Sequence, residues 1–396
     1  MPTRILPRFD FRVEIAAESV TGKVREKNED ALLVAPELAL FGVADGMGGL
    51  DSGEHASRTA IEVARAYLST KEATRKLEEF CRTPTLEVRR SVFELLRGAC
   101  EAAHDKLTRE QEARAERMGT TLDLCLFARD KAFVAHVGDG RVFLARSKAV
   151  LQITEDHLVH DPQSIRRPGS AGRVPRPLAS GVGLPVPLRV DVFPVDLRRN
   201  DTIVLATDGA YGPFEGEAAI SHACRGAPRA ICDTFVKNSL QKGGRDNASL
   251  VVIRVDERFL QRADERGAID AGQVRDCPLF EGLSPSSVLN ALAGGIEVEL
   301  EAGAVVPSFD AGDHCAYVVL DGLVRTEGGT TLGAPAVLFP ESLVGVDHRT
   351  KGVTVVQRLR TLRIRRDDFR EICAHDPVLG MALYERLATH IARTIP

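Results

Sequence analysis

The sequence predicts an α+β protein in which two antiparallel β-sheets pack face to face with helices outside, an αββα sandwich, followed by a β-roll with flanking helices. The chain has 396 residues, which is too long for one ordinary hydrophobic core and indicates two domains. Up to about residue 256, two sets of short strands flank two amphipathic helices. After residue 276, short strands alternate with frequent turns, as in a β-roll.

The first half of the predicted sandwich begins with strands at residues 11–16, 31–34 and 38–43, where apolar and polar residues alternate. Helical spacing of apolar residues follows from Glu54 to Leu68 and again over residues 92–107. Further strands are predicted at residues 121–128, 132–137 and 142–145. Gly138-Asp139-Gly140 is predicted to form an antiparallel hairpin turn between the last two.

The second half of the sandwich is preceded by residues 154–186, which lack periodicity, are rich in turn formers and predict a mobile surface flap. Strands are predicted at residues 188–195, 202–206 and 248–255, and a helix over residues 228–237, because Pro228 suits a first turn. Residues 257–275 are charged and poor in apolar side chains, which predicts a helical linker. The domains are therefore expected at residues 10–256 and 276–396.

The composition excludes several classes of protein. Hydrophobic residues make up 44% and charged residues 27%, as in soluble globular proteins. The net charge is −4 with both signs mixed along the chain, so we expect binding neither to nucleic acid nor to a membrane. Eight cysteines without a Cys-x-x-Cys pair favour reduced core thiols. Because no apolar signal segment and no membrane-spanning run is found, a cytoplasmic location is expected.

Five short segments place an Asp near Gly or Asn at the edge of a hydrophobic run. A strand that ends in a tight glycine turn can hold a carboxylate at a sheet edge, where several such groups converge on Mg²⁺ or Mn²⁺. Taken singly, an Asp-Gly after a strand is more often a plain turn. Together the segments predict a site for several metal ions. They are Asn28-Glu29-Asp30, residues 44–49, Val137-Gly138-Asp139-Gly140, Ala206-Thr207-Asp208-Gly209 and residues 243–247.

In this order and spacing, the motifs resemble those of the metal-dependent Ser/Thr protein phosphatases of the PPM type, across roughly residues 10 to 256. Arg25 stands five positions before Asp30, as the phosphate-binding Arg of that family stands before its motif Asp. The other matching segments are Asp45-Gly46, Gly119-Thr120-Thr121, Gly138-Asp139, Asp208-Gly209 and Asp246-Asn247. The resemblance implies the four-layer αββα phosphatase sandwich and, from Asp-Gly-Met-Gly-Gly, a bacterial style of the family.

The resemblance also implies the ligands of two Mn²⁺ or Mg²⁺ ions. Asp45 would bridge the ions, Gly46 would lend its backbone carbonyl, and Asp208 and Asp246 would complete the shell of the first ion. Asp139 and Asp208 match the positions that bind a third ion in bacterial members, although Asp139 also suits a simple turn. A water between two ions has a lowered pKa and attacks phosphorus in line, so no phosphoenzyme is needed.

Two further residues are expected to act beside the metals. Arg25 would bind the phosphate through its planar guanidinium, and its alternative is a surface salt bridge beside Glu26 and Lys27. Asp30 would bind a metal directly or through a water. The catalytic residues are therefore predicted to be Arg25, Asp30 and Asp45.

The general acid has no obvious candidate in this sequence. Many relatives have a His directly after Asp-Gly or after Gly-Met-Gly-Gly, and these positions hold Met47 and Leu50 here. His55 lies nearby at the start of a predicted helix, where a capping or surface role is expected.

Residues 276–396 resemble a cyclic-nucleotide-binding domain, judged by Pro-Leu-Phe-x-Gly-Leu-Ser, Gly312-Asp313, residues 317–322 and an amphipathic last helix over residues 377–395. Glu341 matches a ribose contact and Arg349 a phosphate contact. Pro340 replaces the Gly of the phosphate-binding turn and removes a backbone N–H, so a cyclic nucleotide is not expected as a ligand. The domain is expected to regulate or localise the enzyme, and its last helix suggests a homodimer.

The sequence thus predicts a metal-dependent phosphatase for phosphoserine and phosphothreonine on proteins, the substrate being a bacterial Ser/Thr kinase or its target. One alternative is a catalytically weak or inactive phosphatase-fold scaffold for protein interaction, but a scaffold has no need for closely spaced carboxylates that repel one another. A third hypothesis is a phosphatase gated by a cyclic nucleotide.

Overall fold

The computed structural model describes residues 4–48, 52–147, 149–159, 177–258, 274, 276–292, 295–307, 309–310, 313–345 and 352–394. The chain divides into two compact units, Met1–Gln261 and Arg262–Pro396. None of the described helices is both long and apolar enough to cross a bilayer.

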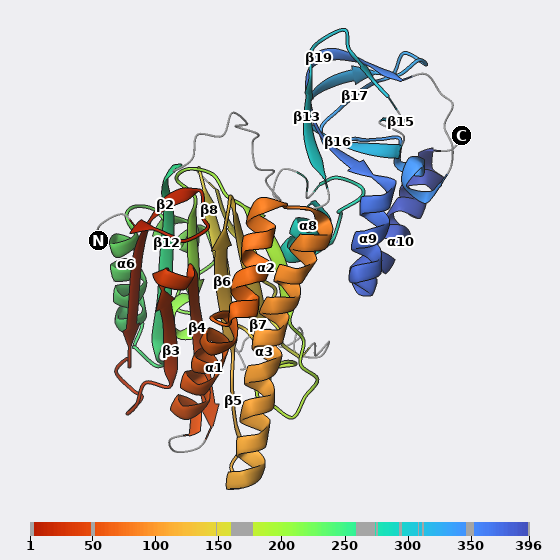
Figure 1. Cartoon of the computed structure of the whole chain (residues 1–396). Coiled ribbons are helices and arrows are strands. Elements are labelled where there is room, and N and C mark those ends of the chain that lie inside the picture. Colours follow the sequence, from red (N-terminus) through yellow and green to blue (C-terminus); the bar gives the residue numbers. More distant parts are fainter. Residues whose placement is uncertain are drawn as a thin grey trace. The chain divides into compact units, whose positions relative to one another are not determined.

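The first unit contains two six-stranded antiparallel sheets (Figure 1). One has the order β1-β2-β12-β11-β8-β9. Its strands are β1 (Arg4–Ile5), β2 (Phe11–Val20), β8 (Arg141–Arg146), β9 (Ala149–Gln152), β11 (Thr202–Ala206) and β12 (Ala248–Arg258). The other has the order β10-β7-β6-β4-β3, with β5 paired to β4. Its strands are β3 (Asp30–Ala35), β4 (Leu40–Gly48), β5 (Met118–Thr120), β6 (Leu122–Ala128), β7 (Lys131–Val137) and β10 (Asp191–Asp196).

Helices cover the outer faces of both sheets, with α1 and α3 on one side and α6 on the other (Figure 1). The helices on the β4 sheet are α1 (Ser52–Leu68), α2 (Lys71–Arg82) and α3 (Leu86–Arg114), and a turn of 3₁₀ helix, η1 (Pro36–Leu38), precedes β4. They bury Ala60, Leu77 and Leu96 against that sheet. The helices on the β12 sheet are α4 (Asp208–Tyr211), α5 (Glu217–Ala223) and α6 (Pro228–Gln241). They form a second core with Ile231 and Phe235. The predicted αββα layering is therefore observed.

Aromatic side chains fill part of the space between the sheets. Phe11 on β2 contacts Phe9, and Phe9 packs edge-on against Phe127 of β6 with ring centroids 5.0 Å apart. Phe127 in turn packs edge-on against Phe41 of β4 at 5.6 Å. All four rings are buried, so this cluster joins the inner faces of the two sheets.

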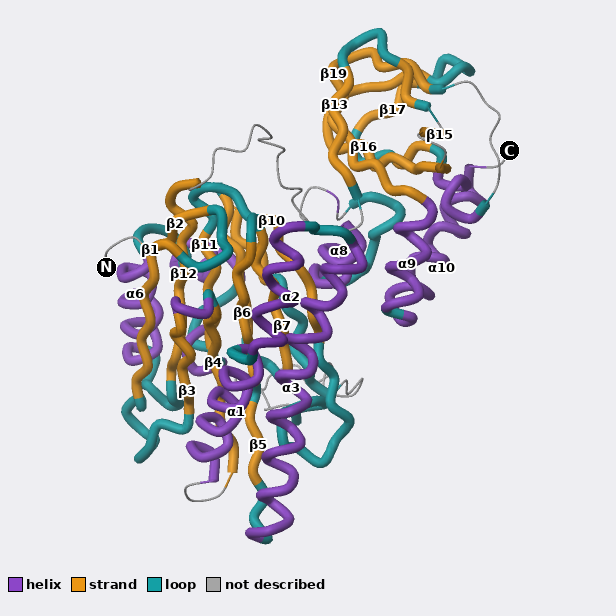
Figure 2. Tube along the Cα trace, in the orientation of Figure 1, coloured by secondary structure: helices purple, strands orange, loops and turns teal. Residues whose placement is uncertain are grey.

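The second unit has a seven-stranded antiparallel sheet followed by two helices (Figure 2). Its central strands are long and pair with each other and with all the short ones. The strands are β13 (Ile296–Leu300), β14 (Val305–Val306), β15 (Phe309–Asp310), β16 (Asp313–Arg325), β17 (Thr331–Gly333), β18 (Val337–Leu338) and β19 (Val353–Arg365). The helices are α8 (Pro285–Leu292), the 3₁₀ turn η3 (Pro340–Val344), α9 (Arg366–His375) and α10 (Pro377–Thr394).

Several details differ from the sequence prediction. The prediction of a hairpin at Gly138-Asp139-Gly140 was wrong, because β7 pairs with β6 and β10 while β8 pairs with β11 and β9 in the other sheet. Helix α2 was not predicted, and α3 is longer than expected. Strand β12 continues to Arg258. Most of the predicted linker, and residues 160–176 of the predicted flap, lie outside the described residues.

Candidate active site and metal centre

Asp45 lies on β4 directly opposite Asp30 on β3, because the register of the two strands pairs them. Its backbone is held by the motif threonines: the Asp45 N–H donates to Thr121 Oγ1 at 2.9 Å, and the Asp45 carbonyl accepts from Thr120 Oγ1 at 2.8 Å. The Gly-Thr-Thr segment therefore fixes the peptide that carries the predicted bridging carboxylate.

Gly46 follows Asp45 at a place where no side chain fits. A Cβ there would lie 2.0 Å from the carbonyl oxygen of Gly53 and 2.6 Å from that of Glu29. The Gly46 N–H also donates to the Glu29 carbonyl at 3.1 Å. Glycine is thus required at this position, and it packs the start of α1 closely against the Asp45 strand.

Asp208 and Asp246 come from neighbouring loops that nearly touch. Asp208 begins α4 after β11, and a Cβ at the next residue, Gly209, would lie 1.8 Å from the Asn247 carbonyl and 3.1 Å from Asp246 Cβ. The sequence motif Asp-Gly therefore serves a physical purpose here, since only glycine lets the two acidic loops approach so closely.

The buried carboxylates have oxygens that no protein group satisfies. Asp30 Oδ2 accepts from the Thr207 hydroxyl at 3.0 Å, whereas Asp30 Oδ1 and Asp208 Oδ1 are buried without a hydrogen-bond partner among the described residues. Buried unpartnered carboxylate oxygens are costly unless a cation or proton satisfies them. These residues therefore fit a hard divalent cation, which prefers such oxygens.

The pKa values of these carboxyls report the same crowding. Burial, together with Asp30 and Asp208, raises the pKa of Asp45 well above its usual range. Burial raises the pKa of Asp30 to about 7, and Asp208 and Asp246 add to the shift. The pKa of Asp208 is also raised, first by burial and then by Asp246. A divalent cation would favour the ionised forms and reverse these shifts.

Arg25 is bound to one of the predicted metal ligands. Its Nε lies 2.9 Å from Asp246 Oδ1, its Nη2 donates to Asp246 Oδ2 at 3.0 Å, and Glu29 lies 3.8 Å from Nη1. The Arg25 side chain is 47% exposed, so part of the guanidinium remains open to solvent. Within the described residues no three acidic, His or Cys side chains already form a metal cage, and Arg25 holds Asp246 in this arrangement.

Asn247 is a structural residue of the site to which sequence reasoning gave no role. Its Oδ1 accepts from the Glu29 N–H at 2.8 Å, and its Nδ2 donates to the Thr21 and Lys27 carbonyls, each at 2.9 Å. It thereby fixes the loop that carries Arg25 beside Asp246. The signal was present in the Asp246-Asn247 dipeptide, but the partners are more than 200 positions away in sequence.

The candidates for a general acid lie elsewhere or are engaged. His55 Nε2 lies 2.6 Å from Glu110 Oε2, so its role is an ion pair or hydrogen bond between α1 and α3. Met47 belongs to β4 and has no acidic proton, and Leu50 lies outside the described residues.

Asp139 lies in the turn that leads from β7 to β8. Burial raises the pKa of Asp139 to about 6, and the charge of Asp208 is the next largest cause. The charges of Asp139 and Asp208 are therefore close enough to repel each other, and the binding of a third ion by the two residues stays a prediction.

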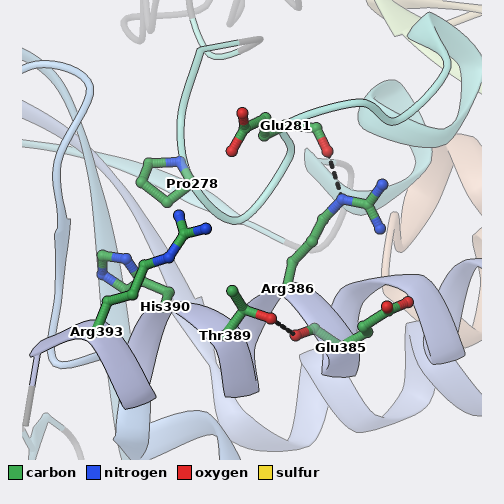
Figure 3. A pocket seen from close by; sticks show the side chains of 7 residues that line it. All are labelled: Pro278, Glu281, Glu385, Arg386, Thr389, His390 and Arg393. Atoms are coloured by element: carbon green, nitrogen blue, oxygen red, sulfur yellow. Dashed lines mark hydrogen bonds between the residues drawn. The ribbon is translucent and has the colours of Figure 1, made fainter.

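The second unit carries a pocket of about 300 Å³ on α10 (Figure 3). Its lining residues are Pro278, Glu281, Glu385, Arg386, Thr389, His390 and Arg393. Of the residues predicted to contact a nucleotide, Glu341 lies on η3 and Arg349 lies outside the described residues. The pocket is lined by neither of them.

Comparison with known proteins supports one family. A model described as Protein phosphatase 2C matches residues 23–242. The serine/threonine phosphatase Stp of Listeria welshimeri is 28% identical over 256 residues, which cover 61% of this chain and 94% of that protein. The Mycobacterium tuberculosis phosphatase PstP is 27% identical over 254 residues, which cover 63% of this chain and 46% of that protein. The solved catalytic domain of PstP with two manganese ions is 26% identical, with a TM-score of 0.50, and the match covers 62% of this chain and 99% of that one.

The matched segment is more than half of the sequence, and the chain belongs to the protein phosphatase 2C family. The predicted enzyme class, a protein phosphatase, is therefore confirmed. The predicted cofactor, manganese or magnesium, agrees with the two manganese ions of the PstP structure. The family match ends at residue 242, so the second unit lies beyond it.

Proposed function

We propose that this chain hydrolyses phosphoserine and phosphothreonine on proteins at the site around Asp45. The observation that carries the proposal is the group formed by the buried Asp30 and the partly buried Asp45 and Asp208. Their pKa values are raised, and Asp30 and Asp208 each have a buried oxygen without a partner among the described residues. Such a group is costly without cations, so its presence supports a metal centre. The family membership supports the reaction.

The geometry and the family resemblance support the proposed ligands. Asp45 would bridge two ions, with the Gly46 carbonyl, Asp208 and Asp246 as further ligands and Asp30 bound directly or through a water. Asp139 would help hold a third ion beside Asp208. Divalent ions at this place would supply an activated water near neutral pH.

The chain's own contribution to phosphate binding is Arg25. Its guanidinium contacts Asp246, and the Arg25 side chain is half exposed, so it lies at the edge of the group of acidic residues. A planar guanidinium binds two phosphate oxygens and stabilises the charge that develops on them. Arg25 would therefore exchange part of its contact with Asp246 for the phosphate.

Hydrolysis of phosphopeptides by the purified full chain tests this function. With Mn²⁺ we expect release of phosphate from phosphothreonine and phosphoserine peptides, abolished by EDTA, and much slower release from a phosphotyrosine peptide of the same sequence. Absence of release from all three peptides over a range of Mn²⁺ concentrations would refute the proposal.

We further propose that residues 10–256 form the phosphatase domain, 257–275 a linker and 276–396 a domain of the cyclic-nucleotide-binding type that regulates or localises the enzyme. Its support is the order of strands, the 3₁₀ turn η3 and two final helices. Pro340 begins η3 after Phe339, which has a φ of 54°. A proline at this turn offers no N–H to a phosphate, so neither cyclic AMP nor cyclic GMP is expected to raise the melting temperature.

The final helix supports a proposal of homodimerisation. Leu379, Leu383 and Leu387 are buried, whereas Val378 and Met381 are 81% and 76% exposed. Exposed apolar side chains on a helix suit a second copy of the same surface. Sedimentation of the full chain should show a dimer that Met381→Lys weakens, and a monomer at all concentrations would refute this.

A further inference from the structure

The turn that carries Asp139 crosses from one sheet to the other and packs tightly against its neighbours. Gly138 has a φ of +112°, and a Cβ there would lie 2.6 Å from Thr121 Cγ2. The turn is therefore adapted to glycine, and its position depends on the groups that contact its backbone.

His157 binds both backbone groups of Gly138. The Gly138 N–H donates to the ring nitrogen Nδ1 of His157 at 3.2 Å, and the backbone N–H of His157 donates to the Gly138 carbonyl at 2.7 Å. His157 Nε2 lies 3.2 Å from Asp191 Oδ2, so the proton belongs on Nε2 and leaves Nδ1 as an acceptor. Burial lowers the pKa of His157, which keeps the ring in this neutral form.

The segment that contains His157 is itself anchored in the core. His136 is fully buried on β7, with Nδ1 2.6 Å from Asp123 Oδ1 and Nε2 2.9 Å from the Glu155 carbonyl. The rings of His136 and His157 are 4.5 Å apart. His157 therefore acts from a fixed position.

Tyr211 binds the next residue of the same turn. Its hydroxyl donates to the Asp139 carbonyl at 2.7 Å, and it is the last residue of α4, the helix that Asp208 begins. The Arg141 guanidinium lies 4.2 Å from the centre of the Tyr211 ring and makes two hydrogen bonds to Asp156, at 2.9 and 2.7 Å. Asp156 is adjacent to His157, so the two contacts on the turn belong to one connected network.

We infer that His157 and Tyr211 are positioning residues that hold the Asp139 turn beside Asp208 and so determine the affinity of the third ion. This inference rests on the proposed function, because that function gives Asp139 its role. The physical need for such residues is repulsion: Asp139 and Asp208 are both acidic and partly buried, and their charges repel each other before a cation binds, so contacts to the backbone help to keep the turn in place.

Manganese binding to the full chain tests the inference apart from turnover. Equilibrium dialysis would count the Mn²⁺ ions bound by the wild type, Tyr211→Phe, His157→Leu and His157→Asn. Tyr211→Phe removes the hydroxyl that binds the Asp139 carbonyl and keeps the ring. His157→Asn keeps an acceptor at the same distance from the backbone as Nδ1, whereas His157→Leu keeps none.

We expect Tyr211→Phe and His157→Leu to weaken one ion by about five- to tenfold, the worth of one hydrogen bond, and to leave the tighter ions unchanged. The Mn²⁺ concentration for half-maximal turnover should rise by the same factor, and His157→Asn should restore most of the affinity. Leu77→Ala, which opens a cavity under α2, is the control for lost stability and should bind manganese as the wild type does.

Unchanged manganese affinity in Tyr211→Phe and His157→Leu would overturn the inference, as would equal weakening by His157→Leu and His157→Asn. If the wild type hydrolyses no phosphopeptide but these variants still lose one ion, the proposed function fails and the positioning roles remain. If turnover is normal and the variants bind manganese normally, the positioning roles alone fail.

Discussion

Substitution of Asp30 by Asn should stabilise the metal-free protein while it damages the enzyme. Asp30 is 9% exposed, and burial raises its pKa from 3.8 to about 7. A group whose pKa is raised on folding costs no stability below its unfolded pKa, and the cost grows as the pH rises to the folded pKa. A pKa raised from 3.8 to about 7 corresponds to a loss of roughly 4 kcal/mol in the free energy of unfolding, which is fully present above pH 7.

Asn keeps the volume of the side chain and an oxygen that accepts from the Thr207 hydroxyl. Its NH₂ group, however, would take the position of Asp30 Oδ1, which has no hydrogen-bond partner among the described residues. An unsatisfied amide costs about 1–3 kcal/mol, so the net gain at pH 8 should be roughly 1–3 kcal/mol. Between pH 4 and pH 7 this gain should appear progressively, since only the wild type loses stability by ionising Asp30.

Urea unfolding of both proteins in EDTA at a series of pH values measures this difference. Asp105→Asn, which changes an exposed carboxylate on α3, is the matched control and should show no such trend. In Mn²⁺ the variant should lose its advantage, because the cation binds the ionised carboxylate. A stability difference between Asp30→Asn and the wild type that does not change with pH would contradict a raised pKa of Asp30 in the folded protein.

Three further predictions concern other parts of the molecule. Arg25→Ala should raise KM for a phosphopeptide by about tenfold, and Arg25→Lys should recover little of the lost affinity, because an ammonium cannot bind two phosphate oxygens as a guanidinium does. Steady-state kinetics would measure both variants, and full recovery of KM by Arg25→Lys would contradict the proposed binding of phosphate by the guanidinium. Phe127→Ala should destabilise the first unit by about 3–5 kcal/mol, because the ring joins both sheets. A loss of unfolding free energy under about 1 kcal/mol in urea would contradict the role of the ring in packing the two sheets together. Saturating Mn²⁺, at about a hundred times its Kd, should stabilise the wild type by about 2.7 kcal/mol, and an unchanged melting temperature would argue against a metal centre.

The layers of the first unit and the carboxyl groups of the candidate site could be predicted from the sequence. Strands that end in Asp-Gly could be recognised because glycine and carboxylate occur together where the backbone must turn closely beside a ligand. Helix α2 could also have been found, since Ala73, Leu77 and Phe80 are spaced as one buried face.

Pairing between distant segments could not be predicted from local patterns. The β7 and β8 strands are almost wholly buried, so neither shows the alternation that assigns a strand to a sheet, and their assignment to different sheets depends on remote partners. In the same way, His157 falls in a stretch without periodicity, and only its contacts with Gly138 and Asp191 show its position.

The most direct test of the metal-dependent phosphatase is turnover of a phosphothreonine peptide by the full chain as Mn²⁺ is titrated, for the wild type, Asp208→Asn and Asp233→Asn. Asp208→Asn keeps the shape of the side chain but removes the charge of a proposed metal ligand. Asp233 lies exposed on α6, so Asp233→Asn serves as the control. We expect manganese-dependent turnover in the wild type and in Asp233→Asn, and its loss in Asp208→Asn. Equal turnover in all three proteins, or turnover that persists in EDTA, would contradict this expectation.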